Sequence, residues 1–203
     1  MKKIMKLIGL GLFIWAMFAG MELLQDKEQL QENMVRLHVV ANSDSEEDQA
    51  IKLQVRDAVV AYLNETLGSF SDIEQVKAYL QGNLHTLEAL ARQALEDAGI
   101  STSVNVSFER EAFPVRQYDT FSLPSGVYQS LRIRIGEAKG KNWWCVVFPT
   151  LCIPQTEDGF QEVAAGSGFS NELSNTLTGE DGYEVRFLIL DWLGKLENML
   201  SNF

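Results

Sequence analysis

The chain has 203 residues with a hydrophobic content of 46%, which suffices for one folded domain of ordinary size plus an appendage and excludes a disordered chain. Residues 1–20 hold three of the 17 basic residues and no acid, so the remainder carries 14 basic against 28 acidic residues. A surface this acidic repels phosphate backbones and anionic head groups, and we therefore expect no binding to nucleic acid.

The N-terminus has the pattern of an export signal. Three lysines among the first six residues precede the uncharged residues 7–20. As a helix this stretch would be about 21 Å long, shorter than the roughly 30 Å hydrocarbon core of a bilayer. The pattern therefore predicts a signal peptide or a short membrane anchor over 1–20, and export from the cytosol. Cleavage and retention both stay open, because neither Ala19 nor Gly20 ends a clean A-x-A site.

The polar residues 21–33 are expected to form a short helix or a linker between the membrane and a single domain over 34–203. That domain begins with a predicted strand, in which Val35, Leu37 and Val39 alternate with polar residues as in a strand with one buried face. Short polar side chains at 42–45 then favour a turn. Carboxylates at 46–48 complement the positive end of a helix dipole, so a helix should follow, capped by Ser43 with Glu46 or by Ser45 with Asp48.

A second apolar helical pattern over 72–98 predicts another helix, with Gly82 and Asn83 as a kink or a break. Two consecutive amphipathic helices with a short link should pack as an antiparallel hairpin. Alternating patterns at 104–108 and 127–135 predict two strands. A third, over 143–148, is apolar on both faces, so we expect it in the centre of the sheet.

Residues 155–181 are rich in Gly, Ser, Asn and acids, and are expected to form a mobile loop with room for one short helix. A C-terminal helix is predicted over 183–202, with a strand as the alternative for its early part, 183–190. One apolar stripe recurs there at helical spacing: Val185, Leu188, Trp192, Leu196 and Met199. The order of elements predicts an α+β fold, in which a helical hairpin and a C-terminal helix pack on a mostly antiparallel sheet of about four strands.

The two cysteines, Cys145 and Cys152, leave alternatives open. In an exported domain they suggest a disulfide, provided that Pro149 turns the chain back after the strand, but two buried thiols fit as well. Alternatively, Cys145 could be a nucleophile with His38 as its base, which would make the chain an envelope-space cysteine hydrolase.

No cofactor or metal is expected. Asn42, Asp44 and Glu46 have the spacing that begins a calcium loop, but the sixth and twelfth positions are Glu47 and Leu53 where such a loop needs Gly and Glu. Glycine motifs for phosphate and a His-Glu-x-x-His motif are missing from the sequence.

The residues best suited to contact a partner lie in two places. One is the polar turn with Asn42, Asp44 and Glu46. The other is the adjacent pair Trp143 and Trp144, whose side chains point to opposite faces of a strand, so that one should be core and the other exposed.

Two runs of this sequence together resemble the stage II sporulation protein R family. The first is RLHVVANSDSEEDQA at 36–50, continued by KLQVRDA at 52–58, and the second is NWWCVVFPTLC at 142–152. Their order, spacing and position after a short exported N-terminus also match. The similarity covers roughly residues 30–155.

This resemblance implies a signalling role in endospore-forming bacteria. Members of the family are made in the forespore, exported into the space between the forespore and mother-cell membranes, and trigger a membrane-embedded aspartic protease in the mother-cell membrane. That protease removes the pro-sequence of the sigma factor sigma-E. The resemblance carries over no catalytic residues.

The patterns indicate an exported domain without a convincing active site, and the resemblance implies that it is an activator. We therefore expect a non-enzymatic, exported activator, secreted or N-terminally anchored, that touches the membrane only through its N-terminal segment. The alternatives are the cysteine hydrolase and a cell-wall-binding module.

Overall fold

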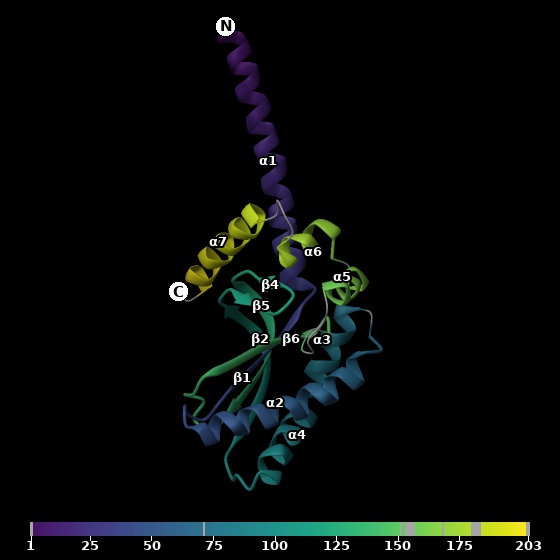
Figure 1. Ribbon diagram of the computed structural model, residues 1–203, viewed down its shortest axis with the longest axis vertical. Helices are drawn as coiled ribbons and strands as arrows, with labels where there is room; N and C mark the ends of the chain where they lie inside the picture. Colours follow the sequence, from purple (N-terminus) through teal and green to yellow (C-terminus); the bar gives the residue numbers. More distant parts are fainter. Residues whose placement is uncertain are drawn as a thin grey trace.

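The computed structural model describes residues 2–70, 72–150, 152, 157–167, 169–179 and 184–201, and places helices on both faces of a four-stranded sheet (Figure 1). One face is covered by α2 (Glu46–Leu67), α3 (Ile73–Gly82) and α4 (Leu84–Asp97). The other is covered by the end of α1 (Lys2–Glu32) and by α5 (Glu157–Gly166), α6 (Asn171–Thr178) and α7 (Glu184–Ser201). Helices on both faces of a mixed sheet confirm the α+β class.

The sheet has the strand order β2 (Val104–Phe113), β5 (Gly126–Ile135), β1 (Val35–Val40) and β6 (Asn142–Phe148). β1 is parallel to β5 and antiparallel to β6, while β2 is antiparallel to β5, so the sheet is mostly antiparallel as predicted. The central position expected for β6 is wrong, because β6 is an edge strand. Its apolar character reflects the coverage of its second half on both faces, while Asn142 and Trp143 at its start are exposed.

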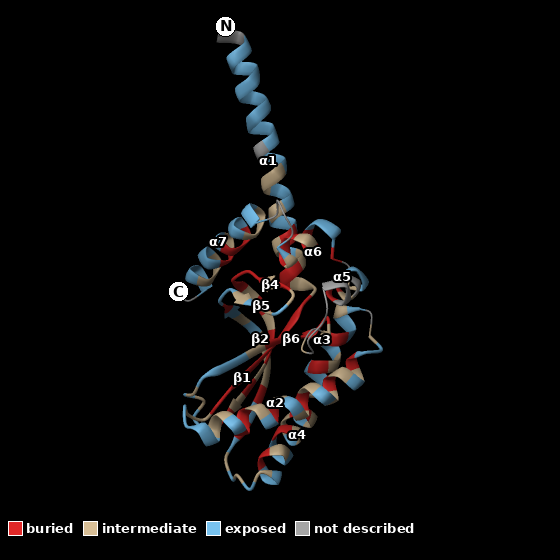
Figure 2. Cartoon of the chain, in the orientation of Figure 1, coloured by how far each residue is buried: buried red, intermediate tan, exposed pale blue. Residues whose placement is uncertain are grey.

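β1 is the strand that the helices enclose. All six of its residues are buried, Arg36 and His38 included, so the expectation of one buried face is wrong (Figure 2). Alternation in the sequence arises here because one side of the sheet is aliphatic and the other is polar and aromatic. Both sides are dry.

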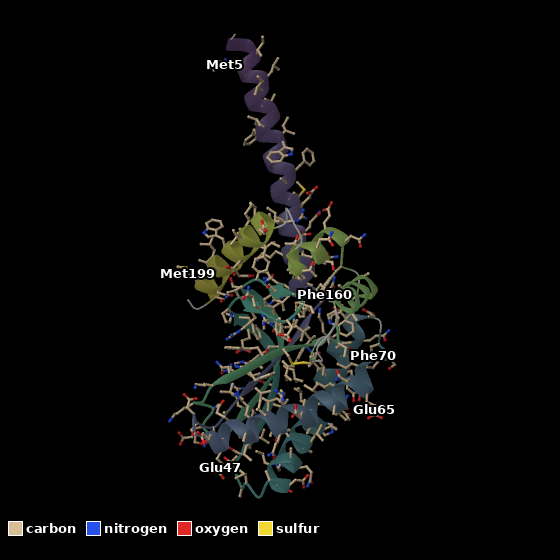
Figure 3. The ribbon with its side chains drawn as sticks, in the orientation of Figure 1. Met5, Glu47, Glu65, Phe70, Phe160 and Met199 are labelled. Atoms are coloured by element: carbon tan, nitrogen blue, oxygen red, sulfur yellow. A yellow bond between two sulfur atoms is a disulfide. The ribbon has the colours of Figure 1, made fainter. Side chains whose placement is uncertain are left out.

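The polar and aromatic side of the sheet is covered by segments that the sequence suggested to be loop or linker. Within 155–181, the described residues form α5 and α6, because apolar side chains four residues apart, Phe160 with Ala164 and Leu173 with Leu177, are buried in one cluster (Figure 3). The prediction of a mobile loop is therefore wrong for 157–167 and 169–179; residues 155, 156, 168, 180 and 181 lie outside the described part of the chain.

Of the short helix or linker expected at 21–33, the structure has the helix. Its residues continue α1 as helix to Glu32, and Leu30 joins the cluster beneath α6. Two short strands, β3 (Arg116–Gln117) and β4 (Ser122–Leu123), pair as a hairpin over the same side, where the sequence suggested an irregular connection.

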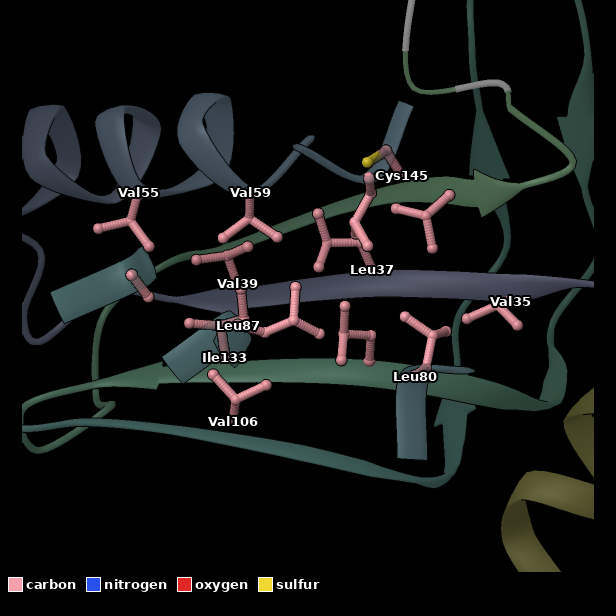
Figure 4. Packing of buried hydrophobic residues seen from close by; sticks show 14 of the residues in the cluster. Val35, Leu37, Val39, Val55, Val59, Leu80, Leu87, Val106, Ile133 and Cys145 are labelled. Atoms are coloured by element: carbon pink, nitrogen blue, oxygen red, sulfur yellow. The ribbon is translucent and has the colours of Figure 1, made fainter. Parts of the chain in front are cut away.

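The aliphatic side is packed as the periodicity predicts (Figure 4). Val55 and Val59 of α2 and Leu87 of α4 meet Leu37 and Val39 of β1, all with at most 1% of their surface exposed. The helical pattern over 72–98 is broken at Asn83 into α3 and α4. Ser45 caps α2 by accepting a 3.1 Å hydrogen bond from the backbone N–H of Asp48, one of the two predicted pairs.

The packing of α6 gives a first testable prediction. Leu173→Ala should lower the free energy of unfolding by about 2–5 kcal/mol, because the side chain is fully buried and its loss leaves a cavity. Asn171→Ala, at an exposed position of the same helix, is the control and should change it by less than about 0.5 kcal/mol. Equal urea midpoints for both variants would show that α6 contributes no packing.

Candidate partner-binding surface

The turn between β1 and α2 is tied to the hairpin that joins β5 and β6. Asn42 Oδ1 accepts a 3.0 Å hydrogen bond from the backbone N–H of Glu137, and Asn42 Nδ2 donates one of 3.0 Å to the Asp48 carboxylate. Asp44 Oδ1 accepts a 2.7 Å hydrogen bond from the backbone N–H of Lys141. Two of the three turn residues suggested as partner contacts therefore hold the molecule's own loops together.

The close approach of turn and hairpin requires a glycine. Gly140 donates to the carbonyl oxygen of Ala41 at 2.9 Å, and a Cβ at this position would collide with the backbone carbonyl of Ser43. Hydrogen bonds from Ser43, first, and from Asn42 hold the pKa of the Asp48 carboxyl below its usual range. Glu46, in contrast, is exposed at the start of α2 and remains available to another molecule.

The two tryptophans lie on opposite faces of β6, as predicted, but neither is core. Trp143 is 38% exposed, and the guanidinium of Arg56 on α2 lies 4.2 Å from its ring centroid. Trp144 is half-buried on the polar side, with the Arg116 guanidinium 3.7 Å from its ring centroid and the ring of His38 stacked at 5.5 Å. A guanidinium over an aromatic face leaves a large ring ordered at the surface. The start of the edge strand β6 therefore carries one tryptophan on each face, and each ring has an arginine guanidinium stacked over it.

Beneath Trp144 lies a polar network that the sequence did not reveal. His38 Nδ1 lies 2.8 Å from Glu111 Oε1, the Ser130 hydroxyl donates to Glu111 Oε2 at 2.9 Å, and Arg132 Nη1 lies 3.4 Å from Glu111 Oε1. Burial raises the pKa of the Glu111 carboxyl, but its bonds to His38 and Ser130 and the Arg132 charge outweigh burial and hold that pKa below its ordinary value. Glu111 belongs to β2, and its polar alternation with Ser107 and Glu109 was the signal that could have placed it there.

This network does not have the geometry of a nucleophile and its base. Ser130 donates to the carboxylate of Glu111 and makes no hydrogen bond to the imidazole of His38 among those described. A serine nucleophile would need the imidazole between itself and the carboxylate. Instead, the network pairs Glu111 with Arg132 and His38 on a largely buried face of the sheet.

A buried arginine completes this side of the sheet. Arg36 is fully buried, and its guanidinium lies 4.0 Å from the ring centroid of Phe113 and 5.0 Å from that of Tyr128. It donates to the Tyr118 hydroxyl at 3.2 Å. The aromatic faces thus take the place of a carboxylate partner in the described residues.

The cysteines form a disulfide, with 5.3 Å between the Cα atoms of Cys145 and Cys152. Of the alternatives considered from the sequence, the structure therefore has the bonded pair. Cys145 also pairs in register with Leu37 on the aliphatic side, whereas His38 pairs with Trp144 on the other. Cys145 is neither a free thiol nor on the same face as His38, so the cysteine-hydrolase hypothesis is wrong in its two named residues.

Among the described residues, no group of three His, Cys, Asp or Glu side chains comes together as a set of metal ligands. The assignment of Asn42, Asp44, Glu46, Trp143 and Trp144 to partner binding stays a prediction, for which the structure supplies the geometry. It favours Trp143 and Glu46, because Asn42 and Asp44 are already bonded within the chain.

The part of the chain that contains this surface also matches known proteins. A family model described as Stage II sporulation protein R matches residues 31–158. The Stage II sporulation protein R of Bacillus subtilis (strain 168) is 30% identical over 186 residues, which cover 82% of this chain and 83% of that protein. No solved structure matches the chain. The matched residues include every strand of the sheet, the β1–α2 turn and the disulfide.

The Glu111 network predicts a pH-dependent contribution to stability. Because the pKa of Glu111 in the folded chain is below its ordinary 4.5, the carboxylate stabilises the fold above that pH, and this contribution is lost as the pH falls through the folded value. Glu111→Gln should therefore cost about 1–3 kcal/mol at pH 7 and much less in acid, once the pH is below the folded pKa, measured by urea unfolding at pH 7 and over an acid series.

Glu109→Gln is the matched control, because Glu109 lies on the same face of β2 but is more exposed and 3.6 Å from Arg132. It should change stability by no more than about 1 kcal/mol at either pH. A Glu111→Gln cost that is the same at pH 7 and in acid would contradict the paired carboxylate.

The disulfide gives a further prediction. Replacing Cys145 and Cys152 together by alanine should lower the free energy of unfolding by about 2–3 kcal/mol, the chain-entropy estimate for so short a loop. Adding reductant to the unchanged protein should shift the urea midpoint in the same direction. If oxidised and reduced protein unfold at the same urea concentration, the bond contributes nothing to stability.

Proposed function

The chain belongs to the stage II sporulation protein R family, and from its role in sporulation we propose a mechanism: it is an exported signal that activates a membrane-embedded aspartic protease in the mother-cell membrane. The activated protease then removes the pro-sequence of sigma-E. The chain acts in the space between the forespore and mother-cell membranes, either released or held by its N-terminal helix.

Two observations support export. The large apolar side chains of α1 from Ile4 to Phe18 are exposed, and the helix is long and apolar enough to cross a membrane, as a signal peptide or an anchor would. The Cys145–Cys152 disulfide suits an oxidising compartment outside the cytosol.

The observation that carries the proposal is the start of β6. As an edge strand, β6 pairs with β1 on one side, and Trp143 at its exposed start is ordered by the guanidinium of Arg56. Tryptophan and arginine are enriched at the centres of interfaces, and an edge strand can accept a strand from a partner. Glu46, exposed at the start of α2 beyond the turn that is bonded to Lys141, adds an acidic group near this edge.

In this proposal the chain activates the protease by binding to it and catalyses no reaction itself. The thiol that the sequence offered as a nucleophile is in a disulfide, and His38 is 5% exposed and bonded to Glu111. A nucleophile and base that cannot meet cannot support covalent catalysis.

The test is Trp143→Ala in the full chain, expressed with its protease and the sigma-E precursor. Processing at limiting chain concentration should fall roughly thirtyfold, which corresponds to the loss of about 2 kcal/mol typical of an interface tryptophan. Protein level and circular dichroism should be unchanged, because the side chain is partly exposed and lies outside the buried core, against the Arg56 guanidinium.

His85→Ala, an exposed ring on α4, is the matched control and should process the precursor normally. Glu46→Lys tests the acidic end of the same surface without disturbing the Asp44 bond to Lys141. Normal processing by well-folded Trp143→Ala would remove the start of β6 as the contact. Processing that continues without the chain would remove the proposed function altogether.

A further inference from the structure

The C-terminal helix α7 presents its apolar side to solvent. Five large side chains that recur every three or four residues define its outer stripe, together with Ile189 beside Leu188: Val185, Leu188, Trp192, Leu196 and Met199. Val185, Leu188 and Trp192 are 65%, 64% and 59% exposed. The stripe expected from the sequence thus exists, but it faces away from the sheet, where a helix of a soluble domain normally presents polar residues.

The inner side of α7 buries Leu190 in the core and is also fixed to the domain by polar contacts. Asp191 accepts hydrogen bonds from the backbone N–H of Ser125 at 2.9 Å and from the Ser125 hydroxyl at 2.6 Å. At the end of the helix, Glu197 pairs with Lys27 of α1 at 2.9 Å. Gly194 packs so closely against the backbone of Ser125 that a Cβ at this position would collide with the Ser125 carbonyl oxygen. Rotating the helix would break these contacts, so the outward stripe is a property of the docked helix.

The outer stripe is continuous with the apolar surface of α1. An apolar groove of about 450 Å³ lies between the two helices, lined by Met17, Met21 and Leu24 of α1 and by Ile189 and Leu193 of α7. α7 starts beside α1 and runs obliquely away from it, with Met199 near its far end (Figures 1 and 3). The groove therefore marks the level at which the apolar N-terminal helix reaches the folded domain.

We propose that the outer stripe of α7 lies in the interfacial layer of the lipid bilayer that α1 enters. An indole such as that of Trp192 favours this layer, and a helix with one apolar side binds there by burying that side among acyl chains. Because the domain is strongly acidic, attraction to anionic head groups does not contribute, so the contact is hydrophobic and needs no anionic lipid. The membrane contact then extends beyond the N-terminal segment.

This inference is independent of the proposed protease activation, since it rests on α7 and α1 alone. Its consequence is orientation. A domain held at two points by α1 and α7 keeps one side turned to the membrane, whereas a domain held by α1 alone can tumble about the helix.

The experiment places a nitroxide on the full chain, reconstituted in phosphatidylcholine vesicles. Leu188→Cys and Met199→Cys carry the label on the outer stripe, and Glu65→Cys carries it on the exposed side of α2. The native cysteines are bonded to each other, so only the introduced thiol reacts. Both stripe positions should show higher accessibility to oxygen and lower accessibility to a water-soluble nickel chelate than Glu65 does, also at high salt.

Three outcomes would overturn the lipid contact. Stripe labels as accessible to the nickel chelate as the label at Glu65 would place α7 in water. Spin–spin broadening that disappears on dilution with unlabelled chain would assign the stripe to a second copy. If the stripe labels become inaccessible to the nickel chelate only when the protease is added, the stripe would bind that protein and not lipid. Circular dichroism of each labelled chain confirms that the fold is kept.

Discussion

The burial of β1 on both faces is the constraint on which the rest of the structure depends. On one side it meets the aliphatic residues of α2 and α4, and on the other it brings Arg36 and His38 into a dry environment. A buried charge is costly unless it is paired. Glu111, the aromatic rings around Arg36 and the helices that exclude water from this side follow from that requirement.

These requirements also explain where the surface is left for function. The polar side chains of β1 and β2 pair with one another inside the domain. Asn42 and Asp44 are used to hold the β1–α2 turn against the hairpin that joins β5 and β6. Besides the exposed part of α1, the described residues leave two exposed features that the fold itself does not need: the start of β6 with Trp143, and the outer stripe of α7. The first lies within the residues shared with the sporulation family, and the second lies beyond residue 158, where the family model ends.

Local signals in the sequence were sufficient for local structure. The Ser45 cap, the break at Asn83 and the alternation of β5 depend on neighbouring residues, and each is present in the structure as predicted. The same signals cannot order strands in a sheet, because order depends on contacts between distant segments. The apolar sequence of β6 therefore suggested a centre where the structure has an edge.

The candidate site was predictable in part. Trp143 was identified by residue type, but its partner Arg56 lies on another element and was not predicted. Glu111 lies 73 residues from His38, and hydrophobic periodicity gives no information about contacts over such a separation. Where the structure has the two helices α5 and α6, the sequence suggested a loop with at most one short helix, because glycines and acids outweighed the few apolar positions that pack. The sequence could not predict that the α7 stripe faces solvent. The helix is oriented by contacts of its inner side with Ser125 and Lys27, which lie far away in the sequence.

The central claim is that the chain signals through what its surface binds and catalyses no reaction. It is tested most directly by titrating the purified chain against its protease in vesicles and measuring cleavage of the sigma-E precursor. The account predicts that cleavage rises with chain concentration and saturates once chain and protease are equimolar. Full activation by a small fraction of that amount, with each chain switching on many protease molecules in turn, would contradict it.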